Sequence, residues 1–457
     1  MTPAPFCAGV AEVEITPPMG VELCGYGPYL KRTCDQVLDP LYARALWMQF
    51  PEAEAVIIAV DICTVSREIR DAAAALLKER FGLDSGHVMV AASHTHSGPS
   101  GQEMIGWGER DAEYLARLPG LLAEAAGRAR AAAVPAGAGA CRMRINGIGR
   151  NREQPQIGPV DPAAQLLAVT RTDGSLLALL YNYGAHGVTR YPFSSRISAD
   201  WPGLVAARVK AETGAMALFL QGACANVNAH EITFSIEHPD AEQVACDLRT
   251  EETARLFCDQ ALPALSIIRP SPTPLFRAAW KELELPCVPM ERPALEQIIA
   301  RRKAGADRMT LAQLRPFAQR LTSETEEEKA WREDRFAVDS AMRQIELMSR
   351  PPYVRKAPVQ LLRIGESVLV GWPCEAFVEL GIELRQRSPY PLTFLSSFAN
   401  DTAGYMPTVA SFESKGQGNE YGYYPREFTP LVYAHLPYRA DVSRILVEET
   451  LQMIRAL

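Results

Sequence analysis

Apolar runs of strand length alternate with segments of helical periodicity in the first part of the chain. Residues 41–50 and 55–60 are apolar and flank a short proline-containing turn, which is typical of two paired strands. Residues 66–80 place apolar side chains at helical spacing behind a serine suited to cap a helix. Residues 112–134 form a second, alanine-rich helical pattern. The apolar run at residues 87–92 predicts a further strand between these two helices.

The same alternation continues to the C-terminus. Residues 163–171 and 176–183 flank a Thr-Asp-Gly-Ser turn, the pattern of a β-hairpin. A helix is predicted from residues 198–202 to about residue 213, followed by an apolar strand at 215–220. Residues 290–350 are charged and helix-rich, which indicates a solvated helical hairpin or, alternatively, a lid over a site. The last predicted elements are strands at 359–364 and 367–370 and a helix at 440–457.

These elements predict a mixed α/β (α+β) fold. Neither an internal repeat nor a low-complexity linker interrupts residues 1–457. We therefore expect a single domain that carries a helical insertion at about residues 290–350.

Composition excludes several classes of protein. The net charge of −7 and the lack of a basic stripe argue against nucleic-acid binding. No stretch approaches the roughly 20 apolar residues of a membrane span. The first residues show neither a basic region nor an apolar core of a signal peptide, so we expect a cytoplasmic protein. Oligomeric state stays open.

Ten cysteines are scattered along the chain without a Cys-x-x-Cys pair. In a reducing compartment they are expected to be thiols, most of them small core residues. Cys224 and Cys374 fall in loops that could contribute to a site, where a nucleophilic role is the alternative.

The most distinctive motif is SHTHSGP at residues 93–99, directly after the strand predicted at 87–92. In an extended segment, side chains two residues apart point to the same face, so His94 and His96 are expected side by side. Neutral imidazole is a good zinc ligand, which makes a metal site the first hypothesis. The alternative is a histidine pair that is hydrogen-bonded within a polar loop.

Three further strands end in loops that offer ligands. These loops contain His186, Glu375 and Tyr405. Ligand sites of α/β proteins collect at strand ends, and catalytic zinc commonly takes three protein ligands from distant parts of a chain. Taken singly, Glu375 could instead be an acid at a helix N-terminus, and Tyr405 a half-buried aromatic residue.

Together these motifs resemble the neutral (alkaline, non-lysosomal) ceramidase family over nearly the whole chain. The motif at residues 93–99 is specific, and the others gain weight from their order and spacing. The matching elements are residues 8–18, 25–26, 44–45, 61, 93–99, 151–152, 182–186, 198–200, 221–228, 372–377 and 404–408.

The resemblance implies a single zinc ion held by His94, His186, Glu375 and Tyr405. A phenolate is an unusual ligand, because the unperturbed tyrosine pKa of about 10 must fall for the anion to bind. His96 would then orient a ligand or hydrogen-bond the substrate carbonyl oxygen as negative charge develops on it.

Further catalytic residues follow from the resemblance with alternatives still open. Arg152 matches the family's active-site arginine, with Arg150 as the alternative. Tyr421 loosely matches a family tyrosine. The family's serine in the loop at residues 221–228 is replaced here, by Asn228 or by Asn226.

The departures from the family change the expected substrate. The serine is missing, no export signal is visible, and the immunoglobulin-like C-terminal domain of ceramidases has no counterpart. We therefore expect a catalytic-domain homologue rather than a ceramidase proper. It would use a zinc-activated water to cleave an amide bond of a small N-acyl molecule, with His96, Arg152, Tyr421 and Asn228 as the catalytic group. The alternatives are an esterase or lactonase on the same zinc site, and a non-catalytic zinc-binding or scaffold protein.

Overall fold

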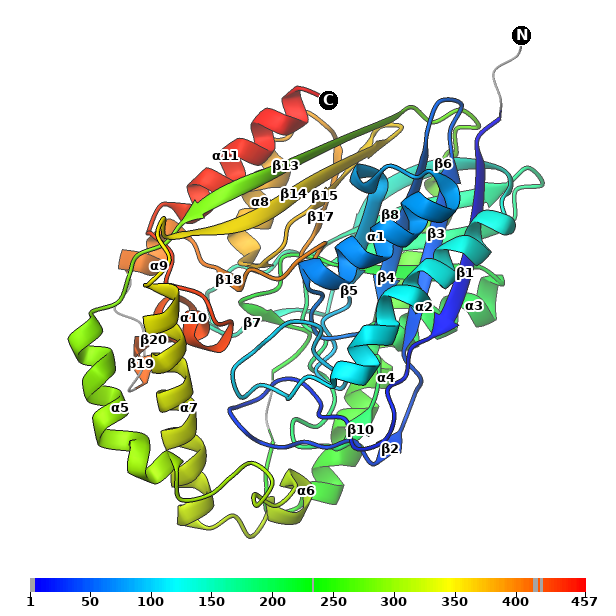
Figure 1. The fold of residues 1–457 in the computed structure, drawn as a ribbon. Helices are drawn as coiled ribbons and strands as arrows, with labels where there is room; N and C mark the ends of the chain where they lie inside the picture. The colour runs from blue at the N-terminus through cyan, green and yellow to red at the C-terminus, as the bar shows by residue number, and fades with distance from the viewer. Residues whose placement is uncertain (1–4, 232–233, 414–417, 420–421) are drawn as a thin grey trace.

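The computed structural model describes residues 5–231, 234–413, 418–419 and 422–457. It has a mixed α/β fold, as the sequence predicts, with one large and one smaller main sheet (Figure 1). The large sheet has the order β11-β9-β8-β6-β1-β3-β4-β5. Its strands, in chain order, are β1 (Cys7–Glu14), β3 (Tyr42–Gln49), β4 (Glu54–Val60), β5 (Val88–Ala92), β6 (Val134–Arg144), β8 (Ala163–Arg171), β9 (Leu176–Tyr183) and β11 (Met216–Gln221).

The large sheet is folded at its centre. β1 pairs with β6 only through Cys7 and Ala8, whereas β1 pairs with β3 along its whole length. Because so few residues join β1 to β6, the sheet can fold there, and β11 also contacts β3, β4 and β5 at the opposite end of the strand order. The two halves therefore face each other across a core of buried aliphatic side chains.

A second sheet of order β13-β14-β15-β17 closes the same core. Its strands are β13 (Phe276–Pro286), β14 (Val354–Ile364), β15 (Ser367–Gly371) and β17 (Leu392–Ser396). The two halves of the large sheet and the second sheet all supply buried side chains to one cluster, which includes Leu46, Ile57, Met89, Leu180, Leu220, Leu362, Leu369 and Phe394.

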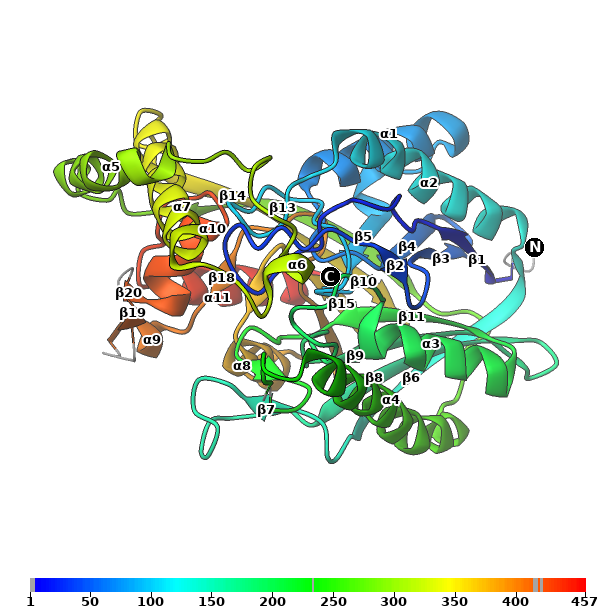
Figure 2. The ribbon, with the colours of Figure 1, turned by 90° about the horizontal axis from the view of Figure 1, so that it is seen from below.

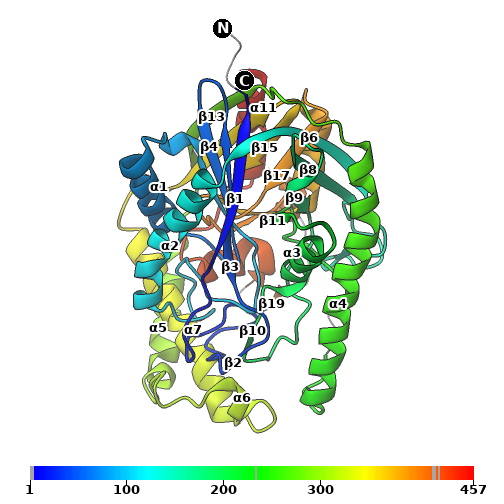
Figure 3. The ribbon, with the colours of Figure 1, turned by 90° about the vertical axis from the view of Figure 1, so that its right-hand side faces the viewer.

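Helices cover the outer faces of the sheets. Figure 3 shows α1 (Arg67–Phe81) and α2 (Ala112–Ala131) on one side, with α3 (Asp200–Thr213) and α4 (Pro239–Ala264) on the other. The helix predicted from residue 66 is confirmed. The Ser66 hydroxyl accepts a hydrogen bond from the Ile69 amide, and Gly82 ends the helix with a φ of 69°. α8 (Val378–Arg387) and α11 (Val442–Arg455) flank the second sheet (Figure 1).

The charged segment forms helices α5 (Arg292–Ala306), α6 (Phe317–Arg320) and α7 (Glu326–Leu347). α7 starts with a capping box, in which Thr325 and Glu328 exchange side-chain to backbone hydrogen bonds. α5 and α7 lie together, beside the short helix α10 (Thr429–Val432) and far from α3 and α4 (Figure 2). Within the described residues, no helix combines the length and apolarity that crossing a membrane requires.

The C-terminal ends of strands from both sheets meet at one place. After β17 the chain turns at Asn400, whose backbone amide donates to the Val90 carbonyl (2.7 Å) in β5. The backbone amide of Ser397 donates to Gln221 at the end of β11 (2.7 Å). Loops that follow β5, β9, β15 and β17 are thereby brought together, although they are far apart in the sequence.

Asn400 provides a test of this junction. Its side chain accepts a hydrogen bond from the Val90 amide (3.0 Å) and donates one to Gln360 (2.8 Å), while its φ is 66°. Asn400→Ala removes both hydrogen bonds and puts a less tolerant residue at positive φ. We expect the free energy of unfolding to fall by about 2–4 kcal/mol in chemical denaturation. Asn146→Ala, at an exposed position, is the matched control, and an equal effect of the two substitutions would contradict the assigned role.

Candidate metal centre

His94 and His96 lie side by side, but not for the reason that strand alternation suggests. β5 ends at Ala92, and His94 has a φ of 61°, so the backbone has already left the extended conformation. The two rings are 4.7 Å apart and nearly perpendicular, with their Nε2 atoms separated by 3.1 Å. The backbone turn at His94 therefore brings the imidazoles together.

His186 is held by two neighbouring segments. Its backbone amide donates to the Val227 carbonyl (3.0 Å), in the short strand β12 (Val227–Asn228), and Trp201 donates to its carbonyl (3.1 Å). The adjacent Gly187 accepts a hydrogen bond from the backbone amide of His96 (3.1 Å). Backbone pairing thus places His186 next to the His94–His96 turn.

Glu375 and Tyr405 are paired across a short parallel ladder. β16 (Glu375–Ala376) and β18 (Tyr405–Met406) put the two residues in register. Gly404, just before Tyr405, has a φ of 79°, and a side chain there would collide with the His435 ring. A glycine is therefore required at this position, both for the positive φ and for the close approach of the His435 ring.

Three of the four expected ligands offer atoms to one point. Nε2 of His186 lies 2.8 Å from Oε1 of Glu375, and Nε2 of His94 lies 3.8 Å from the same oxygen. One ligand atom from each of the three residues lies within 4.8 Å of the other two, and all three side chains are buried. His94, His186 and Glu375 form a group that could hold a metal ion.

The hydrogen bonds around the histidines fit a cation at this point. Nδ1 of His94 faces the Cys63 carbonyl (2.8 Å) and Nδ1 of His186 faces the Val227 carbonyl (3.1 Å). A neutral imidazole has one N–H, and these carbonyls take it, which leaves the Nε2 lone pairs directed toward the carboxylate. Buried lone pairs facing a carboxylate repel each other unless a cation lies between them. The fixing of Nδ1–H by a carbonyl is also the usual outer-shell arrangement of metal-binding histidines.

The titration of these groups agrees with that donor set. Burial lowers the pKa of His94 to about 4, so its imidazole is neutral near pH 7. Burial alone would raise the pKa of Glu375, but the neighbouring His186, His94 and Arg152 outweigh it and hold the pKa at about 2. Two imidazoles and a carboxylate are donors that zinc accepts.

Arg152, and not Arg150, lies at the centre. The Arg152 guanidinium donates a hydrogen bond to the Tyr405 hydroxyl and lies 3.8 Å from Oε1 of Glu375. Arg150, two residues earlier, is directed to Glu231 at 3.3 Å. Arg152 thus links Tyr405 to Glu375, and its side chain remains one-quarter exposed.

The two candidate asparagines have different surroundings. The side chain of Asn226 accepts from the Val378 amide (2.9 Å) and donates to Glu379 (2.9 Å), both at the start of α8. Asn228 forms a parallel bridge with His186, and its side chain makes no hydrogen bond to the described residues. The amide of Asn226 is therefore used in joining two segments, whereas that of Asn228 is unused.

His96 and Tyr421 are the remaining predicted site residues. His96 contacts His94, and its Nδ1 atom is buried without a hydrogen-bond partner among the described residues. Gly25 makes room for that ring, since a side chain there would come within 2.2 Å of Nδ1. Tyr421 lies outside the described residues.

Burial argues against a nucleophilic role for the two cysteines. Cys224 and Cys374 are fully enclosed, and burial raises the pKa of both thiols above the ordinary value. None of the ten cysteines, all of which the structure describes, forms a disulfide.

Two residues at the centre were missed by sequence reasoning. Tyr433 donates from its hydroxyl to Oε2 of Glu375 (2.7 Å). Phe398 stacks on the His94 ring, with centroids 4.0 Å apart and planes 13° apart. Neither residue belongs to a motif or a regular spacing, so only the folded chain brings them to the metal ligands.

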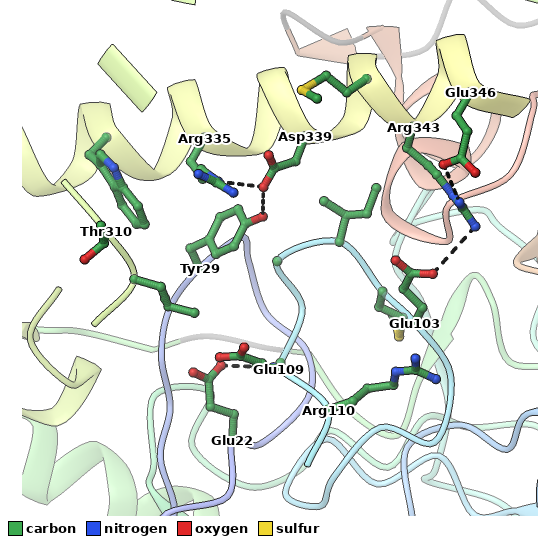
Figure 4. A pocket seen from close by; sticks show the side chains of 17 residues that line it. Glu22, Tyr29, Glu103, Glu109, Arg110, Thr310, Arg335, Asp339, Arg343 and Glu346 are labelled. Carbon is green, nitrogen blue, oxygen red and sulfur yellow. Dashed lines mark hydrogen bonds and ion pairs between the residues drawn. The ribbon is translucent and has the colours of Figure 1, made fainter. Parts of the chain in front are cut away.

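A cavity of about 1000 Å³ lies between α7 and the loops at residues 22–29 and 103–110. Figure 4 shows Arg343 of α7 reaching toward Glu103, and Asp339 of α7 bonded to Tyr29. His94, His186 and Glu375 are not among the residues that line this cavity. The helical insertion therefore forms one wall of a cavity whose lining includes none of the three candidate ligands.

Comparison with known proteins supports the fold. No family model and no curated protein matches this chain. Among solved structures, neutral ceramidase from Pseudomonas aeruginosa is similar with a TM-score of 0.70 and 16% identity, over 99% of this chain and 75% of that one. A structure described as ceramidase complexed with C2 gives a TM-score of 0.71, with the same identity and coverage. The chain thus has a neutral-ceramidase-like fold, as its motifs predict.

The metal centre makes a direct prediction. His186→Ala removes one of the three clustered donors, the imidazole that lies 2.8 Å from Oε1 of Glu375. We expect bound zinc, measured by inductively coupled plasma mass spectrometry, to fall from about one equivalent per chain to near zero. His238→Ala, an exposed histidine at the start of α4, is the control and should retain the metal. Full zinc content in His186→Ala would rule out this donor set.

Tyr433 is predicted to tune the same centre. Tyr433→Phe deletes the hydrogen bond that orients the carboxylate of Glu375 but preserves the shape of the ring. The zinc dissociation constant, measured by competition with a chelator, should rise about 10–100-fold, as for other outer-shell partners. Tyr390→Phe, at a half-buried position before β17, should leave it unchanged. Equal constants for wild type and Tyr433→Phe would contradict the orienting role.

Proposed function

We propose that this protein is a zinc-dependent hydrolase that cleaves the amide bond of a small N-acyl compound. The observation that carries the proposal is the convergence of the His94, His186 and Glu375 donor atoms at one buried point beside Arg152. Tyr405, in register with Glu375, is the fourth proposed ligand. The neutral-ceramidase-like fold supports an amide as the bond that is cleaved.

Zinc, when bound, supplies a Lewis acid that polarises the substrate carbonyl and makes water acidic enough to react near pH 7. The residues of the chain orient the substrate and manage charge. Arg152 carries a positive charge beside Glu375 and the Tyr405 hydroxyl, where it can stabilise an oxygen that becomes negative.

His96 is suited to hydrogen bonding rather than to carrying charge. Burial lowers the pKa of His96 well below the ordinary value, so the ring is neutral near pH 7. One of its nitrogens lies 3.1 Å from Nε2 of His94, and the other has no partner among the described residues. We assign His96 to contact the reacting carbonyl group.

The substrate is proposed to be a small molecule in solution. The esterase or lactonase alternative uses the same residues, because the same chemistry attacks esters more readily than amides. The non-catalytic alternative retains the donors but has no turnover. Activity measurements on matched amides and esters separate all three.

The test is turnover as a function of metal. Protein stripped with a chelator and then reloaded with zinc is assayed on a panel of N-acyl amides and the corresponding esters, with release of the carboxylic acid as the readout. We expect activity that is lost on stripping and restored by zinc, and that falls at least about 100-fold in His96→Ala with zinc still bound. Amide turnover by the stripped protein would contradict the proposal, and turnover of esters alone would favour the esterase alternative.

A further inference from the structure

The Asn228 side chain is a buried polar group that the fold does not use. Only 6% of the residue is exposed, and its Oδ1 atom has no hydrogen-bond partner among the described residues. Its amide nitrogen likewise makes no hydrogen bond to them. A buried acceptor without a partner costs free energy, so such groups usually have a ligand or a special role.

Asn228 faces the metal centre. It is bridged in parallel register with His186, and directly paired residues of neighbouring strands project their side chains to the same face. β12 also pairs with β7 (Arg150–Asn151), where Asn228 lies opposite Arg150. Arg152, just beyond β7, donates from its backbone amide to the Asn226 carbonyl (2.8 Å), and its guanidinium lies 3.8 Å from Oε1 of Glu375.

A comparison with Asn226 shows that the unpaired state of Asn228 is not a general property of this loop. Both amide atoms of Asn226 are bonded, to Val378 and Glu379. The loop thus contains one asparagine that joins two segments and one whose carboxamide is free beside the metal ligands. A structural role explains the first and leaves the second without an explanation.

We infer that Asn228 is the residue by which the site selects secondary amides, because its Oδ1 atom accepts a hydrogen bond from the substrate N–H. This inference rests on the proposed function and refines it. The Oδ1 atom of Asn228 is a buried acceptor without a partner among the described residues, and a secondary amide carries one N–H donor that can supply this hydrogen bond.

The inference explains how the site would discriminate against esters. An ester has a carbonyl oxygen but no N–H, so it leaves the buried acceptor of Asn228 unpaired. A tertiary amide has the same defect. Sites built to hydrogen-bond a substrate N–H reject analogues that lack it more strongly than apolar pockets reject a missing methylene group.

The experiment is a double-mutant-type cycle, in which substitutions of Asn228 are combined with substrates that have or lack the amide N–H. Asn228→Leu is close to isosteric and removes both hydrogen-bonding atoms, and Asn228→Ala is a second variant that cannot overpack the site. Zinc-loaded wild type and variants are assayed on N-octanoyl-p-nitroanilide, its N-methyl derivative and p-nitrophenyl octanoate. Zinc content and circular dichroism report whether each variant is folded and loaded.

We expect wild type to prefer the N–H amide over the N-methyl amide in kcat/KM, and Asn228→Leu to reduce this preference about 10–100-fold. The secondary amide should lose more than the ester in both variants. An unchanged N–H preference in folded, zinc-loaded Asn228→Leu and Asn228→Ala would overturn the inference.

A binding measurement separates failure of the inference from failure of the proposed function. Dissociation constants of the two amides are measured for wild type and Asn228→Leu by calorimetry, which needs no turnover. Tighter binding of the N–H amide that depends on Asn228 would support the inference even if neither amide is hydrolysed, and that result would count against the hydrolase. Equal N–H preferences in binding, together with metal-dependent amide hydrolysis, would overturn the inference and leave the hydrolase intact.

Discussion

The structure of the candidate site depends on one electrostatic constraint, the close approach of two imidazoles and a carboxylate in a buried position. His94 and His186 each direct Nδ1 to a backbone carbonyl, which leaves the Nε2 lone pair directed toward Glu375. In a buried position this arrangement of acceptors is unfavourable without a cation. The stability of the site is therefore coupled to metal binding, and the fold supplies a set of donors that could hold a metal ion.

Much of the surrounding structure keeps these donors in place. Backbone hydrogen bonds from β12 hold His186, the short β16–β18 ladder aligns Glu375 with Tyr405, and the positive φ at His94 turns its ring toward them. Tyr433 binds the second carboxylate oxygen. These contacts favour the arrangement of donors that an ion would need, which lowers the entropic cost of assembling the site.

Polar side chains near the centre fall into two groups according to whether the fold satisfies them. Both side-chain amide atoms of Asn226 are bonded to residues at the start of α8, and this side chain serves to connect two segments. Asn228 retains a buried atom without a partner in the described chain, in a strand that is bridged to His186. Unsatisfied groups are what a substrate can pair with, so this distinction separates the binding surface from its support.

The local pattern of the chain was sufficient for its elements and for the residue types of the site. Apolar periodicity and caps predicted the helix after Ser66, the hairpin around residues 172–175 and the mixed α/β class, because these depend on near neighbours. The motif around His94, together with the resemblance of the ordered motifs, singled out His186, Glu375 and Tyr405.

Tertiary structure alone decided what those residues do together. The sequence could not distinguish Arg152 from Arg150, or Asn228 from Asn226. The two members of each pair are the same amino acid and differ only in the strand or helix that they contact in the folded chain. Tyr433 and Phe398 gave no signal, since their contacts with Glu375 and His94 join segments about 58 and 304 residues apart in the chain. The adjacency of His94 and His96 was foreseen for the wrong reason, as a left-handed backbone turn and not strand alternation produces it. The sequence determines which side chains could act as metal ligands. Long-range packing determines which of them are left without other hydrogen-bond partners.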